Sequence, residues 1–370
     1  MAEKASVSSK RGLITGLNSV GHNLLVQRIV VGLLMAVFFS AALYLRIHFT
    51  SDVVFGGTWV KFTGIDGYWH GRIVDNLCRN FPYMASADPY LLYPGGAGTS
   101  IAAPFFDYLM AGVAWIVGLG SPSQHTVDVV AALFPPVMGA LTIIPVYFIG
   151  KALCSRWAGL IAALLVAILP GEFLGRSILG FIDHHVAEAL FSTTAAMFLL
   201  LALKGMRKER LAWSHLRHPR ASALAAPLTL AVLGGVFLGL YLASWIGALL
   251  FVFIFAAFFV VQFCLDHVSG VPTDYLGLIG GATFLPALVV FVLLGQNGEV
   301  TVVLALAPLV PAALFGLSRL LAALETRPAA ASAAAPRDRA AGQPAGKAAA
   351  RGPGRAAAGE PVVGNGLVRL

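Results

Sequence analysis

The chain has 370 residues, of which 58% are hydrophobic and only 11% are charged. Soluble domains carry about 25% charged residues, so the composition excludes an ordinary soluble protein. The formal net charge is +8, but the basic residues form short clusters beside apolar blocks, which is typical of membrane topology and not of nucleic-acid binding. The three cysteines, Cys78, Cys154 and Cys264, lack the spacing of a disulfide framework or a zinc site.

Blocks of apolar residues with almost no internal charge recur along the chain. Many have the length of roughly twenty residues that a helix needs to cross a ~30 Å hydrocarbon layer. The chain is therefore predicted to be an all-α polytopic membrane protein. The first block follows a basic segment and has no small-residue cleavage site behind it, so we expect it to be retained as the first span. The candidate blocks are residues 29–45, 101–119, 128–149, 157–170, 186–203, 222–243, 247–265, 275–295 and 301–321.

Basic clusters indicate which blocks cross the membrane, because short cytoplasmic loops collect Lys and Arg. An even number of spans must separate any two cytoplasmic clusters. Between the first two clusters, block 101–119 is the weakest span because it contains Pro104 and Asp107. If it is an interfacial or re-entrant helix, about eight spans place every cluster inside. The clusters are Lys4, Lys10, Arg11 and Arg28; Lys151 and Arg156; and Lys204, Arg207, Lys208, Arg210, Arg217 and Arg220.

This topology predicts three parts. A cytoplasmic N-terminus, residues 1–28, precedes a transmembrane domain at residues 29–323. The domain has a long first external loop, residues 46–127, and a second external loop, residues 171–185, which face the same extracytoplasmic compartment. Residues 324–370 are rich in Ala, Pro, Gly and Arg and poor in large apolar residues, so we expect this tail to be disordered.

The first external loop contains the sequence GIDGYWHGRIVDNLCRN, in which Asp66 precedes a helical pattern. Ile73, Leu77 and Phe81 would share one face of that helix. An aspartate at this point can cap the helix by accepting hydrogen bonds from its first free amides. It can also supply an oxygen ligand to a divalent cation. The residue type alone leaves both interpretations open.

The second external loop places Asp183, His184, His185 and Glu188 where the chain enters a span. Ionisable groups at a membrane boundary are costly to desolvate and tend to mark function, although a cluster that only caps the helix is the alternative. Asp183 and His185 are separated by one residue, so an extended or turn backbone can aim both at one cation. His185 and Glu188 would share a helix face.

Arg176 lies on the same external loop, where nothing structural demands a guanidinium. An arginine there suits pairing with phosphate, and contact with lipid headgroups is the alternative. Together with Asp66, Asp183 and His185, it indicates a divalent cation beside apolar helices. Such a site suits a lipid-linked phosphate or pyrophosphate donor whose isoprenoid tail lies in the bilayer. Mn fits a mixed set of carboxylate and imidazole ligands somewhat better than Mg does.

At these residues the sequence resembles the catalytic subunit family of oligosaccharyltransferases. The matching segments are IDGYWHGRIVDN, DPYLLYPGG and GRSILGFIDHH, with PVMGALTIIPVYFIGKAL and YLASWIG in the order that the family shows. Together they cover roughly residues 25–320, and their combination is more specific than any one of them. The resemblance implies the polytopic fold of lipid-dependent glycosyltransferases, the GT-C type.

The resemblance also implies a site and a reaction. In the family, a first-loop Asp and a D-x-D or D-x-H pair in the second loop bind Mg or Mn, which carries over to Asp66, Asp183 and His185. The family transfers an oligosaccharide from a lipid-linked phosphate or pyrophosphate carrier to asparagine in an N-x-Ser/Thr acceptor. The expected partners are therefore that donor, an acceptor polypeptide and membrane lipid, with the active site on the extracytoplasmic face, which in a bacterium is the outer side of the inner membrane.

Family members continue with further spans, a long external loop with a catalytic Glu, and a soluble domain with a WWDYG motif. These features have no counterpart in this sequence, so we expect the chain to be the membrane half of a longer enzyme. One alternative is another polyprenyl-phosphate-sugar glycosyltransferase of the same fold, which would not need the D-x-H pair. Another is a transporter or a non-catalytic fragment that binds lipid-linked glycan. Transporters place polar residues near the bilayer midplane, whereas the ionisable residues here gather at one surface.

Overall fold

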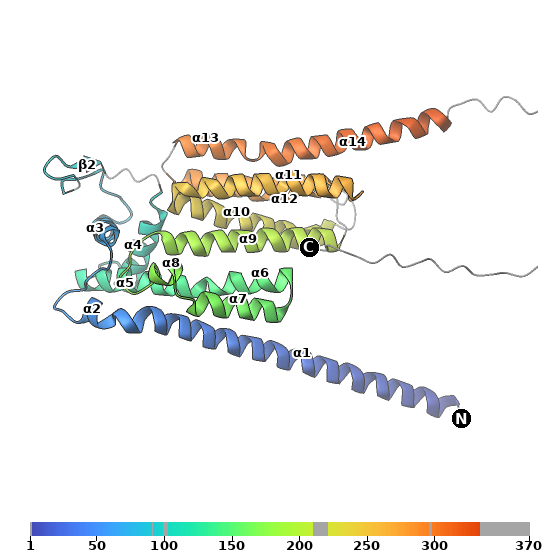
Figure 1. Ribbon diagram of the computed structural model, residues 1–370, viewed down its shortest axis with the longest axis horizontal. Helices are drawn as coiled ribbons and strands as arrows, with labels where there is room; N and C mark the ends of the chain where they lie inside the picture. Colours follow the sequence, from blue (N-terminus) through green and yellow to red (C-terminus); the bar gives the residue numbers. More distant parts are fainter. Residues whose placement is uncertain (1, 91, 99–102, 210–220, 296–297, 334–370) are drawn as a thin grey trace, which may run out of the picture. The chain divides into compact units, whose positions relative to one another are not determined.

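The computed structural model describes residues 2–333, except for residue 91 and the segments 99–102, 210–220 and 296–297. Contacts divide the chain into two units, Met1–Ser318 and Arg319–Leu370, and the first unit contains all the predicted site residues. Its long helices lie side by side (Figure 1). The only strands among the described residues form one short antiparallel pair, in which Ala87 lies opposite Gly98. The predicted all-α fold is confirmed.

The first third of the chain begins with one long helix and continues in short elements that carry the first predicted loop. These are α1 (Ala2–Ile47), η1 (His48–Thr50), α2 (Ser51–Phe55), α3 (Ile65–Asn80), β1 (Ala87–Asp88), β2 (Ala97–Gly98) and α4 (Phe105–Val117). The rest is helical and mostly long. Its elements are α5 (Gln124–Leu141), α6 (Ile143–Leu153), α7 (Arg156–Ile168), α8 (Glu172–Gly175), α9 (His185–Lys208), α10 (Ala221–Ser244), η3 (Ile246–Ala248), α11 (Leu249–Val268), α12 (Asp274–Leu294), α13 (Gly298–Leu306) and α14 (Leu309–Ala333).

Seven of the described helices or continuous helix pairs are long and apolar enough to cross a membrane. They are Leu24–Phe55, Gln124–Leu153, His185–Lys208, Ser222–Ser244, Leu249–Val268, Asp274–Leu294 and Gly298–Leu324. The remaining predicted span, residues 157–170, forms α7, whose 13 residues extend only about 20 Å. Block 101–119 forms α4, which also has 13 residues, so length does not distinguish this predicted interfacial helix from the predicted span α7.

Two helices continue beyond the predicted membrane spans. Helix α1 begins at Ala2, before the apolar block that starts at residue 29, because no proline interrupts the preceding basic segment. Helix α14 continues to Ala333 and so includes the first part of the tail that we expected to be disordered from residue 324. Alanine has the highest intrinsic helix propensity, which accounts for this extension. The rest of the predicted tail, residues 334–370, lies outside the described residues.

Helices α10 and α12 pack at very short range through a small-residue motif. Gly235 and Gly239 form a G-x-x-x-G pair on α10. A Cβ atom at Gly235 would lie 2.1 Å from the carbonyl oxygen of Thr283, and one at Gly239 would lie 2.8 Å from that of Ala287. Only glycine permits such close backbone approach, which is a common basis of helix association in membranes.

The described members of the second and third predicted cytoplasmic clusters lie at one end of the helices, whereas Arg210, Arg217 and Arg220 lie outside the described residues. The Arg156 side chain donates a hydrogen bond to Gln27, and Lys204 donates one to the carbonyl of Ala152. These contacts join the start of α7 to α1, and α9 to the end of α6. Figure 1 shows this end opposite to the one that carries α3 and α8. The arrangement is the one that the basic clusters predict, with both polar loops at the other end.

The turn between α8 and α9 is attached to α5 through a carbonyl that a proline leaves free. Pro136 lies inside α5 and has no N–H, so the carbonyl of Ala132, four residues earlier, lacks its helical partner. That carbonyl accepts a hydrogen bond of 2.9 Å from the backbone N–H of Gly180. Gly180 has φ +80°, and a Cβ there would lie 3.0 Å from the Val54 side chain. The position therefore requires glycine.

Arg46 fixes the same turn from the side of α1. Its side chain is fully buried and donates hydrogen bonds to Ser177 Oγ (2.9 Å) and to the carbonyl of Ala167 (3.0 Å). Its own carbonyl accepts a bond of 2.8 Å from the Leu179 N–H, and its guanidinium lies 5.3 Å from the centre of the Phe173 ring. One buried side chain thus joins α1 and α7 to the segment that leads to Asp183.

Labelling with a membrane-impermeant thiol reagent tests whether the two predicted external loops face the same side of the membrane. Tyr68→Cys and Glu172→Cys, made singly in a background without Cys78, Cys154 and Cys264, should both react in intact cells, because both side chains are well exposed at the end opposite to the basic clusters. Native Cys154, kept as the only thiol, is exposed beside Lys151 and should react only after permeabilisation. Labelling of Tyr68→Cys and Glu172→Cys from opposite sides would contradict a shared compartment.

Replacing Arg46 tests whether its buried hydrogen bonds stabilise the turn between α8 and α9. Arg46→Met should lower the free energy of unfolding by roughly 2–4 kcal/mol, because it leaves buried hydrogen-bonding groups of the turn and of α7 without a donor. Arg28→Met is the matched control on the same helix, since Arg28 is exposed, and it should change stability by only about 0.5 kcal/mol or less. Unfolding in detergent, followed by circular dichroism, measures both. Equal stability of the two variants would show that the turn does not depend on Arg46.

Candidate functional site

The two predicted loops meet at the turn between α8 and α9, residues 176–184, here called the Gly180 turn. The backbone N–H of Thr63 donates a hydrogen bond of 2.8 Å to the carbonyl of Gly180. Gly67 on α3 lies against the same turn: a Cβ atom there would be in ordinary contact, at 3.6 Å, with the Gly180 carbonyl oxygen and with the backbone nitrogen of Ile182. This contact brings the beginning of α3, with Asp66 and His70, beside the residues that precede Asp183.

Asp66 lies in the first turn of α3 and is exposed. The N-cap position belongs to Gly64, and no side chain accepts a hydrogen bond there. The alternative interpretation of Asp66 as a helix cap is therefore not what the structure shows. Asp66 lies four residues before His70, so the two share one face of the helix, and its carboxylate contributes to raising the pKa of His70.

Asp183 lies two residues before the start of α9, and the residue is only 3% exposed. Its Oδ2 is 3.3 Å from His185 Nε2. Its Oδ1 is 2.8 Å from His184 Nδ1 and 3.9 Å from His70 Nε2, but neither approach satisfies hydrogen-bond geometry, so this buried oxygen has no hydrogen-bond partner among the described residues. Burial acts to raise the pKa of the Asp183 carboxyl, but the three imidazoles outweigh it and hold the pKa below its ordinary value.

His185 begins α9 and connects Asp183 to two further predicted residues. Its Nδ1 lies 2.6 Å from Glu188 Oε1, which confirms that these two side chains share a helix face. Its Nε2 contacts a guanidinium nitrogen of Arg176. Arg176 also pairs with Glu172, at 2.6 Å, and its side chain is 43% exposed. The predicted phosphate-binding arginine thus lies directly against the predicted metal-binding histidine.

His70 and Asp107 are site neighbours that the sequence analysis did not select. His70 Nδ1 lies 2.7 Å from Asp107 Oδ1, and both side chains are buried. Burial acts to lower the pKa of His70, but the Asp107 carboxylate, helped by Asp183 and Asp66, outweighs it and raises the pKa above its ordinary value. One signal was available: an aspartate inside the apolar helix α4 needs a polar partner, because an unpaired buried charge is very costly.

His184 connects the turn to α10. Its ring stacks on that of Trp245, with ring centres 6.0 Å apart and an angle of 22° between the planes. Trp245 follows the end of α10 and belongs to the segment YLASWIG. A third part of the chain therefore borders the cluster formed by His70, Asp183, His184, His185 and Glu188, here called the histidine–carboxylate cluster.

The chemistry of the cluster suits a divalent cation. Two sets of side chains offer ligand atoms within 4.8 Å of one another: His70, Asp183 and His184, and His184, His185 and Glu188. Imidazole nitrogens and carboxylate oxygens are accepted by Mn, Zn and related cations. The buried Asp183 Oδ1 without a partner is the atom that such a cation would satisfy. Asp66 belongs to neither set.

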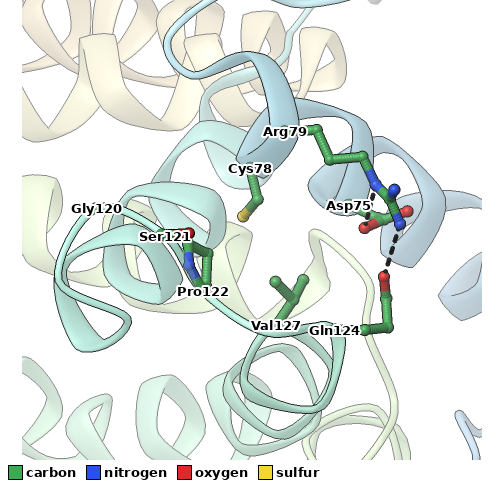
Figure 2. A pocket seen from close by; sticks show the side chains of 8 residues that line it. All are labelled: Asp75, Cys78, Arg79, Gly120, Ser121, Pro122, Gln124 and Val127. Atoms are coloured by element: carbon green, nitrogen blue, oxygen red, sulfur yellow. Dashed lines mark hydrogen bonds and ion pairs between the residues drawn. The ribbon is translucent and has the colours of Figure 1, made fainter.

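A separate pocket lies between α3 and the turn that leads into α5 (Figure 2). Arg79 spans its edge, pairing with Asp75 (3.0 Å) and Gln124 (3.0 Å). Cys78 also lines the pocket, and burial raises the pKa of its thiol to about 11. The pocket shares no lining residue with the histidine–carboxylate cluster, so it is not part of the candidate site.

Comparison with curated proteins shows similarity to an archaeal glycosyltransferase. The dolichyl-monophosphooligosaccharide–protein glycotransferase AglB of Haloferax volcanii is 34% identical over 257 residues, which are 69% of this chain and 24% of that protein. The chain thus spans about a quarter of the length of this relative.

Two solved structures share the fold. The oligosaccharyltransferase AglB of Archaeoglobus fulgidus, in complex with an inhibitory peptide and a dolichol-phosphate, matches with a TM-score of 0.70 and 27% identity, over 79% of this chain and 34% of that one. An oligosaccharyltransferase of the same organism, in complex with Zn and sulfate, matches with a TM-score of 0.67 and 28% identity, over 77% of this chain and 35% of that one. The GT-C type of fold is thereby confirmed.

The family itself follows from a model that covers most of the chain. The model described as oligosaccharyl transferase STT3, N-terminal, matches residues 33–329. This range includes α3, the Gly180 turn and the whole histidine–carboxylate cluster. The chain belongs to the oligosaccharyl transferase STT3 family and corresponds to its N-terminal part.

Proposed function

We propose that this chain is the membrane part of an enzyme for protein N-glycosylation. The complete enzyme would transfer an oligosaccharide from a lipid-linked phosphate or pyrophosphate to asparagine in N-x-Ser/Thr, with Asp66 and Asp183 as catalytic residues. The observation that carries the proposal is the contact of the Gly180 turn with α3. It brings a first-loop carboxylate and the Asp183 turn to one end of the helices in a member of the STT3 family.

In this proposal, a divalent cation, Mn or Mg, is held by Asp66, Asp183 and His185. Asp183 lies before the first turn of α9, so its carboxylate and the His185 imidazole converge, as the D-x-H spacing requires. Asp66 is exposed and free to turn toward the site from the neighbouring helix. A cation held in this way would neutralise negative charge on the phosphate leaving group of the donor. A similar oligosaccharyltransferase binds Zn and sulfate, which supports a cation and an oxyanion in such a fold.

Arg176 would pair with the phosphate of the donor. In the structure, its guanidinium contacts His185 Nε2, the nitrogen that a cation would need. Its pair with Glu172 is exposed, and exposed ion pairs are worth little, so Arg176 can leave both partners at small cost. Donor phosphate would offer it a stronger charge-assisted partner while His185 becomes available as a ligand.

The proposed partners follow from the relatives. One archaeal oligosaccharyltransferase with this fold binds a dolichol-phosphate and an inhibitory peptide, which supports a lipid-linked donor and a polypeptide acceptor for the complete enzyme. The apolar helices provide the membrane environment in which an isoprenoid tail would lie. We place the site on the extracytoplasmic face because the basic clusters gather at the other end of the helices.

Donor binding tests the role of Arg176. Arg176→Ala should raise the Kd of the chain for a fluorescent polyprenyl pyrophosphate in the presence of Mn by about 10- to 100-fold, the equivalent of losing roughly 1.5–3 kcal/mol of charge-assisted hydrogen bonding. Arg79→Ala is a matched control, because Arg79 has the same i,i+4 pairing with an acidic residue, Asp75, and is also exposed. Its Kd should equal that of the unaltered chain.

The same assay tests the proposed function as a whole. Removal of Mn with EDTA should weaken binding of the pyrophosphate lipid by the unaltered chain. Equal Kd values for Arg176→Ala and Arg79→Ala would contradict the role of Arg176. Binding that neither EDTA nor Arg176→Ala alters would contradict a cation-dependent donor site altogether.

A further inference from the structure

The strongest unassigned feature is the buried pair of His70 and Asp107. His70 lies on the inner face of α3 and is 5% exposed, and Asp107 on α4 is 1% exposed. The His70 ring also makes an edge contact with Phe106, with ring centres 5.5 Å apart. Two ionisable groups are thus enclosed between helices, where each is costly to desolvate. Asp107 Oδ2 has no hydrogen-bond partner among the described residues, so packing alone does not account for the pair.

Asp107 determines which nitrogen of His70 carries the proton. Its carboxylate can only accept, so at 2.7 Å from His70 Nδ1 it requires a hydrogen on that nitrogen. In the neutral imidazole this leaves the lone pair on Nε2. Many metal-binding histidines have this arrangement. One ring nitrogen binds the metal and the other donates its hydrogen to a carboxylate, which fixes the tautomer and the direction of the ring.

His70 Nε2 faces the buried Asp183 carboxylate across a gap. The distance from Nε2 to Asp183 Oδ1 is 3.9 Å, which is too long for a hydrogen bond. The nearest polar atom to Oδ1 is His184 Nδ1, at 2.8 Å, but its direction does not satisfy hydrogen-bond geometry, so Oδ1 has no hydrogen-bond partner among the described residues. A lone pair and a carboxylate oxygen that face each other in a buried space repel unless a positive charge lies between them. Two ligands at about 2.1 Å from one cation are separated by at most about 4.2 Å, so the gap has the size of a shared cation.

We propose that His70 is a further ligand of the divalent cation, binding through Nε2 opposite Asp183 Oδ1, and that Asp107 is the residue that positions it. This inference rests on the proposed function, because it concerns the cation that Asp183 would hold there. It adds a second ligand from the face of α3 that carries Asp66, so that α3 would contribute Asp66 and His70 from successive turns. The alternative is a doubly protonated His70 that would itself supply the positive charge and repel a cation.

The two interpretations predict opposite effects of removing the imidazole. For the purified 370-residue chain in lipid nanodiscs, we expect His70→Ala to weaken Mn binding at least about tenfold. We expect Asp107→Asn to weaken it by about 10- to 100-fold, as for outer partners of other metal-bound histidines. The control is His125→Ala, an exposed histidine outside the cluster, which should leave the Mn affinity unchanged. A charged His70 would instead make His70→Ala bind Mn more tightly.

Electron spin echo spectroscopy of bound Mn gives a direct count of ligated imidazoles. The unaltered chain should show nitrogen couplings from two imidazoles, and His185→Ala should retain the coupling from His70. This second variant keeps the test decisive if His70→Ala fails to fold. Unchanged or tighter Mn binding in His70→Ala, or loss of all nitrogen coupling in His185→Ala, would overturn the inference and leave the proposed cation site standing. An unaltered chain that binds no Mn would overturn both.

Discussion

The candidate site depends on one backbone hydrogen bond, from the N–H of Gly180 to the carbonyl of Ala132. The bond exists because Pro136 has no N–H with which to occupy that carbonyl inside α5. A proline within a membrane helix is tolerated when another group satisfies the freed carbonyl, and here that group belongs to the turn before Asp183. The position of Asp183 is therefore fixed by the interior of a spanning helix and not by the loop itself.

From this turn, the same few residues connect every part of the cluster. The Gly180 carbonyl accepts a hydrogen bond from the Thr63 N–H and so holds the beginning of α3. The Leu179 N–H donates a hydrogen bond to the carbonyl of Arg46 at the end of α1. Backbone bonds between rigid helices position a catalytic or metal-binding group more precisely than a free loop does. This explains how residues far apart in the sequence, such as His70 and Asp183, come to face each other at a buried position.

A second buried carboxylate shows what distinguishes the cluster. Asp266, near the end of α11, is 1% exposed, but it accepts hydrogen bonds from Tyr275 (2.6 Å) and Gln262 (2.8 Å) and lies 3.4 Å from Arg207. Both of its oxygens have partners, as is usual for a structural polar group. Asp183 is almost as deeply buried, yet one of its oxygens faces imidazoles without a hydrogen bond. The contrast supports the proposed cation at Asp183, whereas hydrogen bonds within the chain satisfy both oxygens of Asp266.

Much of this arrangement was predictable from the sequence. Hydropathy located the long helices, and the apolar block predicted from residue 186 begins next to His185, where α9 starts. The pairs of His70 with Asp107 and of Arg46 with Ser177 were not predictable, since they join residues that only tertiary packing brings together. Asp66 was predicted as a possible cap, but Gly64 occupies the cap position. The extension of α14 beyond residue 324 was also missed, because low complexity does not exclude an alanine-rich helix.

The most direct test of the central claim is an experimental structure of the chain with Mn, in which anomalous scattering locates the ion. The account predicts one Mn peak at the Gly180 turn, about 2.1–2.6 Å from a carboxylate oxygen of Asp183, with the Asp66 carboxylate turned toward the same ion. A peak away from Asp183 would contradict the account. So would an Asp66 carboxylate more than about 10 Å from Asp183, a separation that ligand bonds of this length cannot bridge.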